Sequence, residues 1–248
     1  MTGDPLLILL GTLLGLVIGS FAATVVVRMP EGRSALVGRS ACDGCGRALK
    51  AWELLPLASY LLARSRCRTC GGAIDPIHPQ IEIAAMLIGA VSAALLPPVL
   101  ALTAALFGWT LLVLAALDLR HFWLPDRIVL PLGVAGLAVN AGGIGPGIVP
   151  AAIGAAAGFG ILWAVGAAYQ ALRKRRGLGG GDPKLLGAIG AWVGWAPLPF
   201  VLLGAALLGI VLVLLDRLRG TKVEATTRVA FGALLAAAAW PAWVLVLR

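Results

Sequence analysis

The chain has 248 residues, of which 60% are hydrophobic and only 12% are charged, and its formal net charge is +9. A soluble domain of this size needs far more polar surface, so the composition excludes one and indicates a polytopic membrane protein. The positive charge does not require a nucleic-acid partner, because the cytoplasmic loops of membrane proteins collect lysine and arginine. We therefore expect an all-α protein that lies in the lipid bilayer and binds no nucleic acid.

The apolar stretches of the chain predict about eight transmembrane helices. Their glycines and alanines are plentiful, and small residues allow helices to pack closely in lipid. The expected spans are residues 5–27, 81–96, 99–117, 125–139, 147–172, 184–195, 198–215 and 229–247.

The basic residues test this number of spans. They gather in four loops, with eight in residues 28–80, two in 118–127, five in 173–184 and four in 216–228. With eight alternating spans, these loops share one face and hold nineteen of the twenty lysines and arginines. The positive-inside rule makes that face cytoplasmic, and both termini then lie on the opposite side.

A polar insert separates the first two spans. The sequence thus predicts three parts: a first transmembrane helix in residues 1–27, a cytoplasmic insert in 28–80, and a seven-helix membrane domain in 81–248. The insert has too few apolar residues to fold on a core of its own, so it needs a cross-link such as a bound metal ion.

Four cysteines in the insert can provide such a cross-link. They form two pairs, Cys42 with Cys45 and Cys67 with Cys70, and glycines follow each pair. Two CxxC motifs at this separation are typical of a tetrahedral four-thiolate metal site. A reducing compartment disfavours disulfides, which remain an alternative together with free thiols. Zinc is the expected metal and iron the alternative, and four protein ligands indicate a structural rather than a catalytic site.

Two aspartates stand at the cytoplasmic edge of the predicted spans. Asp118 ends the third span, and Asp182 begins the sixth directly after three glycines, Gly179 to Gly181. Placing a carboxylate at membrane depth costs free energy, so such a residue usually has a function. Two acids from different spans at one depth can meet across a helix bundle.

Such a pair is able to hydrolyse a peptide bond. Two carboxyl groups a few ångströms apart hold one shared proton. The ionised group activates a water, while the protonated one polarises the carbonyl and later serves the leaving amine. A Ser/His or Cys/His nucleophile is poorly supported, because the only histidines, His78 and His121, have no convincing partner.

Two further acids lie near the spans. Asp126 begins the fourth span, where a helix cap or first-turn acid is as reasonable as a supporting role. It is also the main rival for the second catalytic position. Glu82 begins the second span, and a first-turn acid at a helix N-terminus is favoured there over a direct role.

Several motifs occur together in one order along the chain. They are Gly15–Phe21 with Arg28-Met29-Pro30, the paired CxxC insert, Asp118-Leu119-Arg120 with Leu124-Pro125-Asp126, Gly179–Lys184, Gly187–Trp192 and Phe231-Gly232. In this combination the chain resembles the type IV prepilin peptidases, also called type IV leader peptidases, which are intramembrane aspartyl proteases of the GxGD class. Ala230 and Ala233 depart from the pattern of that family, in which proline is common at both positions.

The resemblance implies both a reaction and its residues. Asp118 and Asp182 would be the catalytic dyad, and the four cysteines would bind structural zinc. The supporting residues would be Gly179, Gly181, Lys184 and Asp126. The family removes a short basic leader from prepilins or type II secretion pseudopilins, at the cytoplasmic face of the bacterial inner membrane.

A second activity is implied by the resemblance alone. Many members also methylate the new N-terminal amine with S-adenosylmethionine, and those members typically carry the cysteine insert. No residue of this chain is singled out for the methyl donor.

Two readings from other classes remain. One is a non-enzymatic zinc-ribbon scaffold or assembly factor whose acids line an ion path. The other is a transporter, which would show repeat symmetry and charges at the midplane rather than at the edge.

Overall fold

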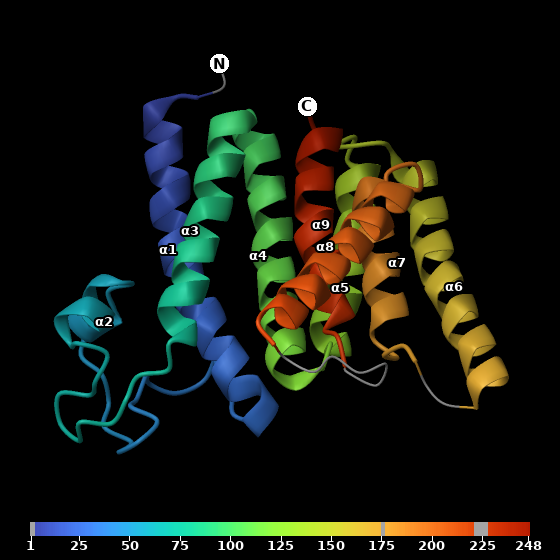
Figure 1. Cartoon of the computed structure of the whole chain (residues 1–248). Helices are drawn as coiled ribbons and strands as arrows, with labels where there is room; N and C mark the ends of the chain where they lie inside the picture. The colour runs from blue at the N-terminus through green and yellow to red at the C-terminus, as the bar shows by residue number, and fades with distance from the viewer. Residues whose placement is uncertain (1–2, 175–176, 221–227) are drawn as a thin grey trace. The chain divides into compact units, whose positions relative to one another are not determined.

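The computed structural model describes residues 3–174, 177–220 and 228–248, and within them the regular secondary structure is helical apart from two isolated β-bridges. The predicted all-α class is confirmed, and each predicted span corresponds to an apolar helix (Figure 1). These helices are α1 (Pro5–Arg28), α3 (Ile77–Leu95), α4 (Pro98–His121), α5 (Asp126–Ala141), α6 (Ile148–Arg173), α7 (Asp182–Val193), α8 (Leu198–Leu218) and α9 (Phe231–Val246).

The helices differ in how far they can reach through a bilayer. Among the described residues, five of them (α1, α3, α4, α6 and α8) are long and apolar enough to cross. Helices α5 and α9 have 16 residues each, and α7 has only 12. Twelve residues rise about 18 Å, against a hydrocarbon core of roughly 30 Å. Helix α7 is therefore a partial span.

The described chain forms two compact units, Met1–Val113 and Leu114–Arg248, which divide within α4. In the first unit α1 and α3 pack backbone against backbone. A Cβ added at Gly11 would lie 2.6 Å from the carbonyl oxygen of Gly89, and one at Gly19 would lie 2.7 Å from the Cα of Glu82. Glycine is what permits this close approach.

The insert of the first unit contains three short helices, η1 (Met29–Glu31), η2 (Ala51–Leu54) and α2 (Ala58–Leu62). It is joined to α3 by Glu82, whose Oε2 accepts a hydrogen bond of 2.7 Å from the N–H of Leu57. The prediction of a first-turn acid at Glu82 is wrong, because α3 begins earlier, at Ile77. Glu82 is 5% exposed and lies more than one turn inside the helix.

The second unit is built around α7. This helix packs against α5, α6 and α9, and every residue in it except Lys184 is buried. Small residues bring α6 close, since a Cβ at Gly158 would lie 2.5 Å from the carbonyl oxygen of Leu186. Asp182, at the start of the central helix, is thus fixed by neighbours on three sides.

A buried amide closes the other end of α7. The last carbonyls of a helix have no partner within it, and lipid cannot supply one. The Nδ2 of Asn140, a residue that is 2% exposed, donates to the carbonyl oxygens of Ala191 and Trp192 at 3.0 Å each. Its Oδ1 accepts from the N–H of Gly147 at 3.1 Å. This one side chain allows α7 to end inside the protein after only three turns.

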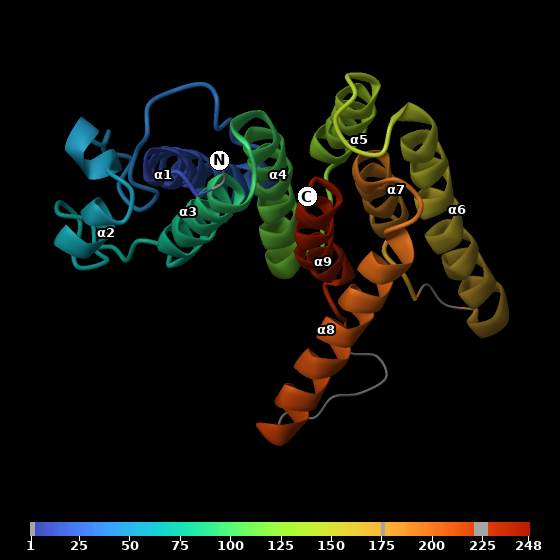
Figure 2. The same ribbon diagram turned by 90° about the horizontal axis from the view of Figure 1, so that it is seen from above.

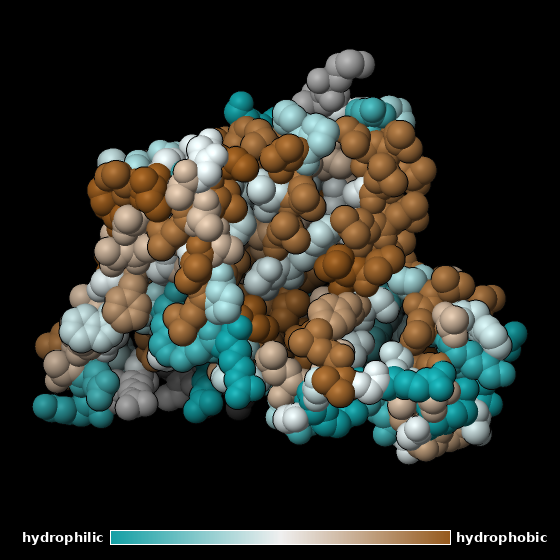
Figure 3. Space-filling model, turned by 180° about the vertical axis from the view of Figure 1, so that it is seen from behind, coloured by the Kyte–Doolittle hydropathy of each residue, from teal (hydrophilic) through white to brown (hydrophobic). Residues whose placement is uncertain are grey.

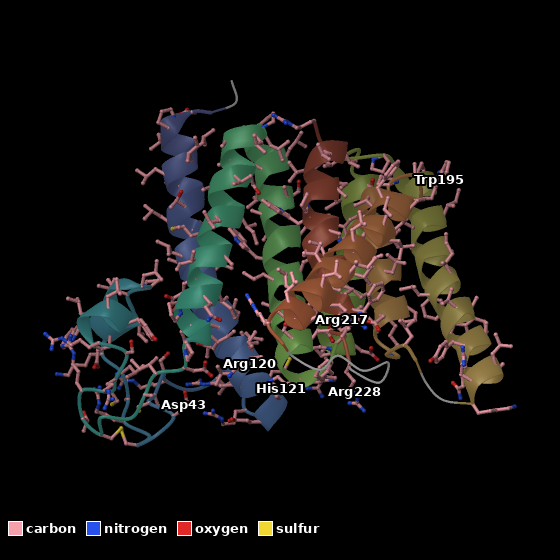
Figure 4. All side chains as sticks on the ribbon, in the orientation of Figure 1. Asp43, Arg120, His121, Trp195, Arg217 and Arg228 are labelled. Atoms are coloured by element: carbon pink, nitrogen blue, oxygen red, sulfur yellow. The ribbon has the colours of Figure 1, made fainter. Side chains whose placement is uncertain are left out.

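The polar residues of the second unit gather at one end. Figure 4 shows Arg120, Arg217 and Arg228 at the lower end and Trp195 at the opposite one. In Figure 3, apolar residues cover the sides of the helices, and hydrophilic residues gather toward the lower edge. This arrangement matches the predicted basic face. The residues at 175, 176 and 222, which were counted toward that face, lie outside the described residues.

We predict that Asn140→Leu lowers the stability of the second unit. The substitution keeps a similar volume but leaves two helix carbonyls without a donor, which costs about 1–2 kcal/mol. The thermal unfolding midpoint of the detergent-solubilised protein measures the loss. Val134→Ala, at a position of the same helix that is 67% exposed, is the matched control and should change the midpoint little. An Asn140→Leu midpoint equal to that of the wild type would contradict the assigned role.

Candidate active site and metal centre

Asp182 is held by the glycine loop that precedes it. Residues 177–181 are not helical, and α7 begins at Asp182 with a proline in its first turn, where the fixed φ of proline suits a helix start. The N–H of Gly179 donates to Asp182 Oδ2 at 3.0 Å. A Cβ on Gly179 would lie 2.9 Å from that same oxygen. The loop therefore folds back tightly onto the carboxylate, which is 6% exposed.

Asp118 is held by the start of another helix. It lies near the end of α4, is 5% exposed, and its Oδ2 accepts a hydrogen bond of 2.9 Å from the N–H of Ala233. Ala233 is in the first turn of α9, where backbone N–H groups lack partners and attract a carboxylate. A proline at this position would have no N–H, so the bond depends on the alanine that sets this chain apart from the family pattern.

Gly232 is the point at which the two acids meet. A Cβ added there would lie 2.9 Å from Asp118 Oδ2 and 3.2 Å from Asp182 Oδ1. Both oxygens thus lie within 3.2 Å of one point, and they are separated by no more than twice that distance. Two carboxyl groups this close can cooperate on one water and one peptide bond.

Leu124 closes the space beside the acids. It lies in the turn between α4 and α5 and is 8% exposed. Its Cδ1 is 2.8 Å from the Cβ position of Gly232, and its Cβ is 2.8 Å from that of Gly181. One leucine therefore fills the gap that the two glycines leave. In the sequence Leu124 stands out only as part of the Leu124-Pro125-Asp126 motif, and its place between the two glycines is visible only in the fold.

Asp126 has a different partner. Both of its carboxylate oxygens accept from Lys184 Nζ at 2.8 Å, which ties the first turn of α5 to the first turn of α7. The structure therefore brings two predicted supporting residues together and pairs Asp126 with a lysine. His121 is exposed and does not contribute to the surroundings of either acid in the described structure.

A pocket of about 310 Å³ opens beside the glycine loop. One wall is α6, through Leu162, Trp163 and Gln170, and the other is the loop, through residues 177–180. Because Gly179 also donates to Asp182, the pocket lies next to the loop that holds this acid. It offers room for part of a peptide next to the glycine backbone.

The four cysteines of the insert converge. All four Sγ atoms lie within 4.8 Å of one another, and those of Cys42 and Cys70 are 3.9 Å apart. Thiolates around one tetrahedral zinc ion at 2.3 Å are separated by about 3.8 Å, so the set fits a metal. Each CxxC motif and the glycine after it form a tight turn, which we call a knuckle. The two knuckles have the same geometry: Gly46 and Gly71 both have a φ of +70°, and their N–H groups donate to the carbonyl oxygens of Cys42 and Cys67 respectively.

Backbone hydrogen bonds favour the thiolate at Cys67, and an ion pair fixes the loop nearby. Backbone N–H groups of Cys70 and Thr69 lower the pKa of the Cys67 thiol to about 6, and the thiolate is the form that binds metal. The Arg47 guanidinium donates to both oxygens of Glu53 at 2.9 and 2.7 Å. Together with the Lys50 N–H, it lowers the pKa of Glu53 to about 2.

These features define a class: a helical membrane protein with a buried pair of aspartates and a four-cysteine metal-binding insert. Two family models match the chain. The type IV leader peptidase family matches residues 105–214, and the bacterial Peptidase A24 N-terminal domain matches residues 13–96. The chain belongs to the type IV leader peptidase family, as the sequence resemblance predicted.

Relatives with established names agree. A prepilin leader peptidase/N-methyltransferase of Burkholderia pseudomallei (strain K96243) is 40% identical over 90% of this chain and 81% of its own length. Proteins of the same name from Pseudomonas aeruginosa and Aeromonas hydrophila are 37% and 38% identical, over 97% and 92% of this chain and 91% and 87% of their own lengths. No solved structure gives a significant match.

We predict that Gly232→Ala abolishes leader cleavage while the protein still folds. The added methyl group would lie 2.9 Å from Asp118 Oδ2 and would push the acids apart. The measurement is cleavage of a synthetic prepilin by purified variants, with the thermal midpoint as the folding check. Gly160→Ala, in α6 and outside the pocket lining, is the matched control, because a Cβ there meets nothing within 4 Å. Wild-type cleavage by Gly232→Ala would show that the acids do not need this close approach.

Proposed function

We propose that Asp118 and Asp182 are the catalytic dyad of a membrane-embedded aspartyl endopeptidase that removes the leader from prepilins or pseudopilins. The observation that carries the proposal is the single point near Gly232 that lies within 3.2 Å of a carboxylate oxygen from each acid. Membership of the leader peptidase family supports it and leaves the scaffold alternative without support.

The reaction uses one water and one shared proton. The ionised carboxylate of the pair takes a proton from the water, whose oxygen attacks the peptide carbonyl carbon. The protonated carboxyl group donates a hydrogen bond to the carbonyl oxygen as negative charge develops there. The C–N bond then breaks, and the new amine receives a proton from the pair. Burial of both acids supports this chemistry, because low solvent access keeps the shared proton in place.

The substrate needs an extended segment between the acids. The glycine loop and the adjoining pocket of about 310 Å³ provide a surface on which such a segment can lie. Leu124 fills the remaining space and has to move aside when the peptide enters. The leader is then cut on the basic face of the second unit, which we assign to the cytoplasmic side of a bacterial inner membrane.

The relatives that match over most of the chain are named for a second activity, N-methylation. We assign the same activity to this chain, acting on the amine that cleavage releases. S-adenosylmethionine is the expected methyl donor and would supply the methyl group. The prepilin or pseudopilin is thus the substrate of both steps.

The metal centre has a structural task in this scheme. Four thiolates leave no open position for water or substrate, which is typical of a structural zinc site. The insert has no apolar core of its own. Within residues 29–76 of the described structure, Cys67 is the only buried hydrophobic residue. Zinc bound by Cys42, Cys45, Cys67 and Cys70 would therefore hold the insert together.

We predict about one zinc ion per chain, by analogy with four-thiolate sites. Cys42→Ser removes one of the four ligands, so metal content should fall sharply and the insert should become sensitive to protease. Elemental analysis of the purified protein measures the metal. Ser40→Ala is the control, because Ser40 lies two residues before Cys42 and is not a ligand. Full metal content in Cys42→Ser, or iron in place of zinc, would refute the assignment.

We predict that Asp118→Asn and Asp182→Asn each abolish leader cleavage while the protein still inserts. An amide preserves the shape of the carboxyl group but can neither accept nor deliver the proton that hydrolysis requires. Cleavage of a synthetic prepilin, followed by mass, is the measurement.

Asp126→Ala is the matched comparison. Its ion pair with Lys184 is solvent-exposed and positions α7 rather than reacting, so cleavage should fall by about tenfold or less. Normal cleavage by Asp118→Asn or Asp182→Asn would exclude that acid from the dyad. Complete loss in Asp126→Ala would make Asp126 a member of it.

A further inference from the structure

The insert exposes a run of large apolar side chains. The exposed fractions are 54% for Trp52, 42% for Leu54, 53% for Leu55 and 72% for both Leu61 and Leu62. All five lie within eleven residues, in η2, in α2 and between them. Several large apolar side chains exposed in so short a stretch indicate a site of interaction. We call residues 52–62 the apolar run.

The apolar run lies beside α3 instead of beyond its end. Leu57, which precedes α2, donates its N–H to Glu82, and Glu82 is five residues into α3. At 1.5 Å per residue, this contact is about 7 Å along the helix from its first residue. Figures 1 and 2 agree, because α2 stands to the side of α3 in both views. The run thus lies beside the first turns of α3, a helix long and apolar enough to cross a membrane.

Basic residues flank the run. Lys50 precedes it, and Arg64, Arg66 and Arg68 follow it, all with exposed side chains. The single acid within the run, Glu53, is already paired with Arg47. In Figure 3 apolar residues gather along the upper edge of the insert, and hydrophilic residues cover its lower part. The surface therefore combines exposed leucine and tryptophan with unbalanced positive charge.

We propose that the apolar run docks onto the bilayer surface, with its leucines and Trp52 at the boundary between headgroups and acyl chains. The basic residues that flank it would bind the headgroups of anionic phospholipids. An apolar face with adjacent lysine and arginine is the pattern of interfacial membrane anchors.

A lipid surface fits better than a protein partner for a geometric reason. Both ends of the insert continue into apolar helices, α1 and α3, and Glu82 fixes the start of α2 against the second of them. A segment held at this height by two membrane helices meets lipid whenever the protein is in a bilayer. This docking would also orient the two knuckles, which lie on the side of the insert away from the apolar run.

The test uses the full chain in nanodiscs of phosphatidylcholine alone or mixed with phosphatidylglycerol. A photo-crosslinking residue, p-benzoylphenylalanine, replaces Leu62 in one protein and Asp43 in the other. Asp43 is an exposed knuckle residue at the lower edge of the insert (Figure 4). We expect lipid adducts at position 62 and few at position 43, read by intact mass. In the mixed nanodiscs, phosphatidylglycerol should exceed its share of the bilayer by about fivefold among the adducts.

Two further proteins separate the contributions. Arg64→Gln/Arg66→Gln/Arg68→Gln should keep the adducts at position 62 but lose the preference for phosphatidylglycerol. Leu61→Asp, combined with the crosslinker at position 62, should reduce adducts in both lipids. Metal content equal to that of the unmodified protein certifies that the insert is folded in each case. A folded protein without lipid adducts at position 62, or with adducts to a second chain instead, would overturn the proposal.

Discussion

Two carboxyl groups held close together inside a helix bundle are the constraint on which the second unit depends. Each is almost fully buried, so bulk water can solvate neither one well. The protein solves this with backbone N–H groups at two helix starts. Gly179 serves Asp182 before α7, and Ala233 serves Asp118 in the first turn of α9. The position of each acid is therefore inseparable from the place where a helix begins.

The short length of α7 follows from the same need. A helix that starts at the buried acid and ends after 12 residues leaves carbonyls without partners at its far end. Asn140 satisfies two of them, and the indole N–H of Trp192 donates to the carbonyl oxygen of Leu132 at 2.8 Å. With the Asp126–Lys184 pair at the near end, α5 contacts α7 along its whole length. These contacts position Asp182, whereas α9 positions Asp118.

Much of this could be read from the sequence, because charge and hydropathy act locally. The eight apolar helices, the four-cysteine cluster and the placement of Asp118 and Asp182 at two helix ends all follow from residue order. Contacts between distant segments do not. Gly232, Ala233 and Leu124 appeared only as parts of a family pattern, without the contacts that they make. Asn140 carried a signal, since it is an amide within an apolar span, but its partners 51 and 52 residues away are visible only in the fold.

The error at Glu82 has the same origin. The polar insert was expected to end at residue 80, yet α3 begins at Ile77 and includes residues 77–80. That shift moves Glu82 from a helix end to a buried contact with Leu57. A carboxylate expected to serve its own helix instead connects two parts of the first unit. The two families of contact, acid to helix start and acid to insert, show how buried polar groups organise both units.

The most direct test of the central claim, that Asp118 and Asp182 act as one catalytic unit, is the cleavage rate of the double variant Asp118→Asn/Asp182→Asn. Residues that work as a unit are strongly non-additive, because removing either one already removes the reaction. The double variant should therefore cleave a synthetic prepilin no more slowly than either single variant. A double variant whose loss is the product of the two single losses would mean that the acids act independently.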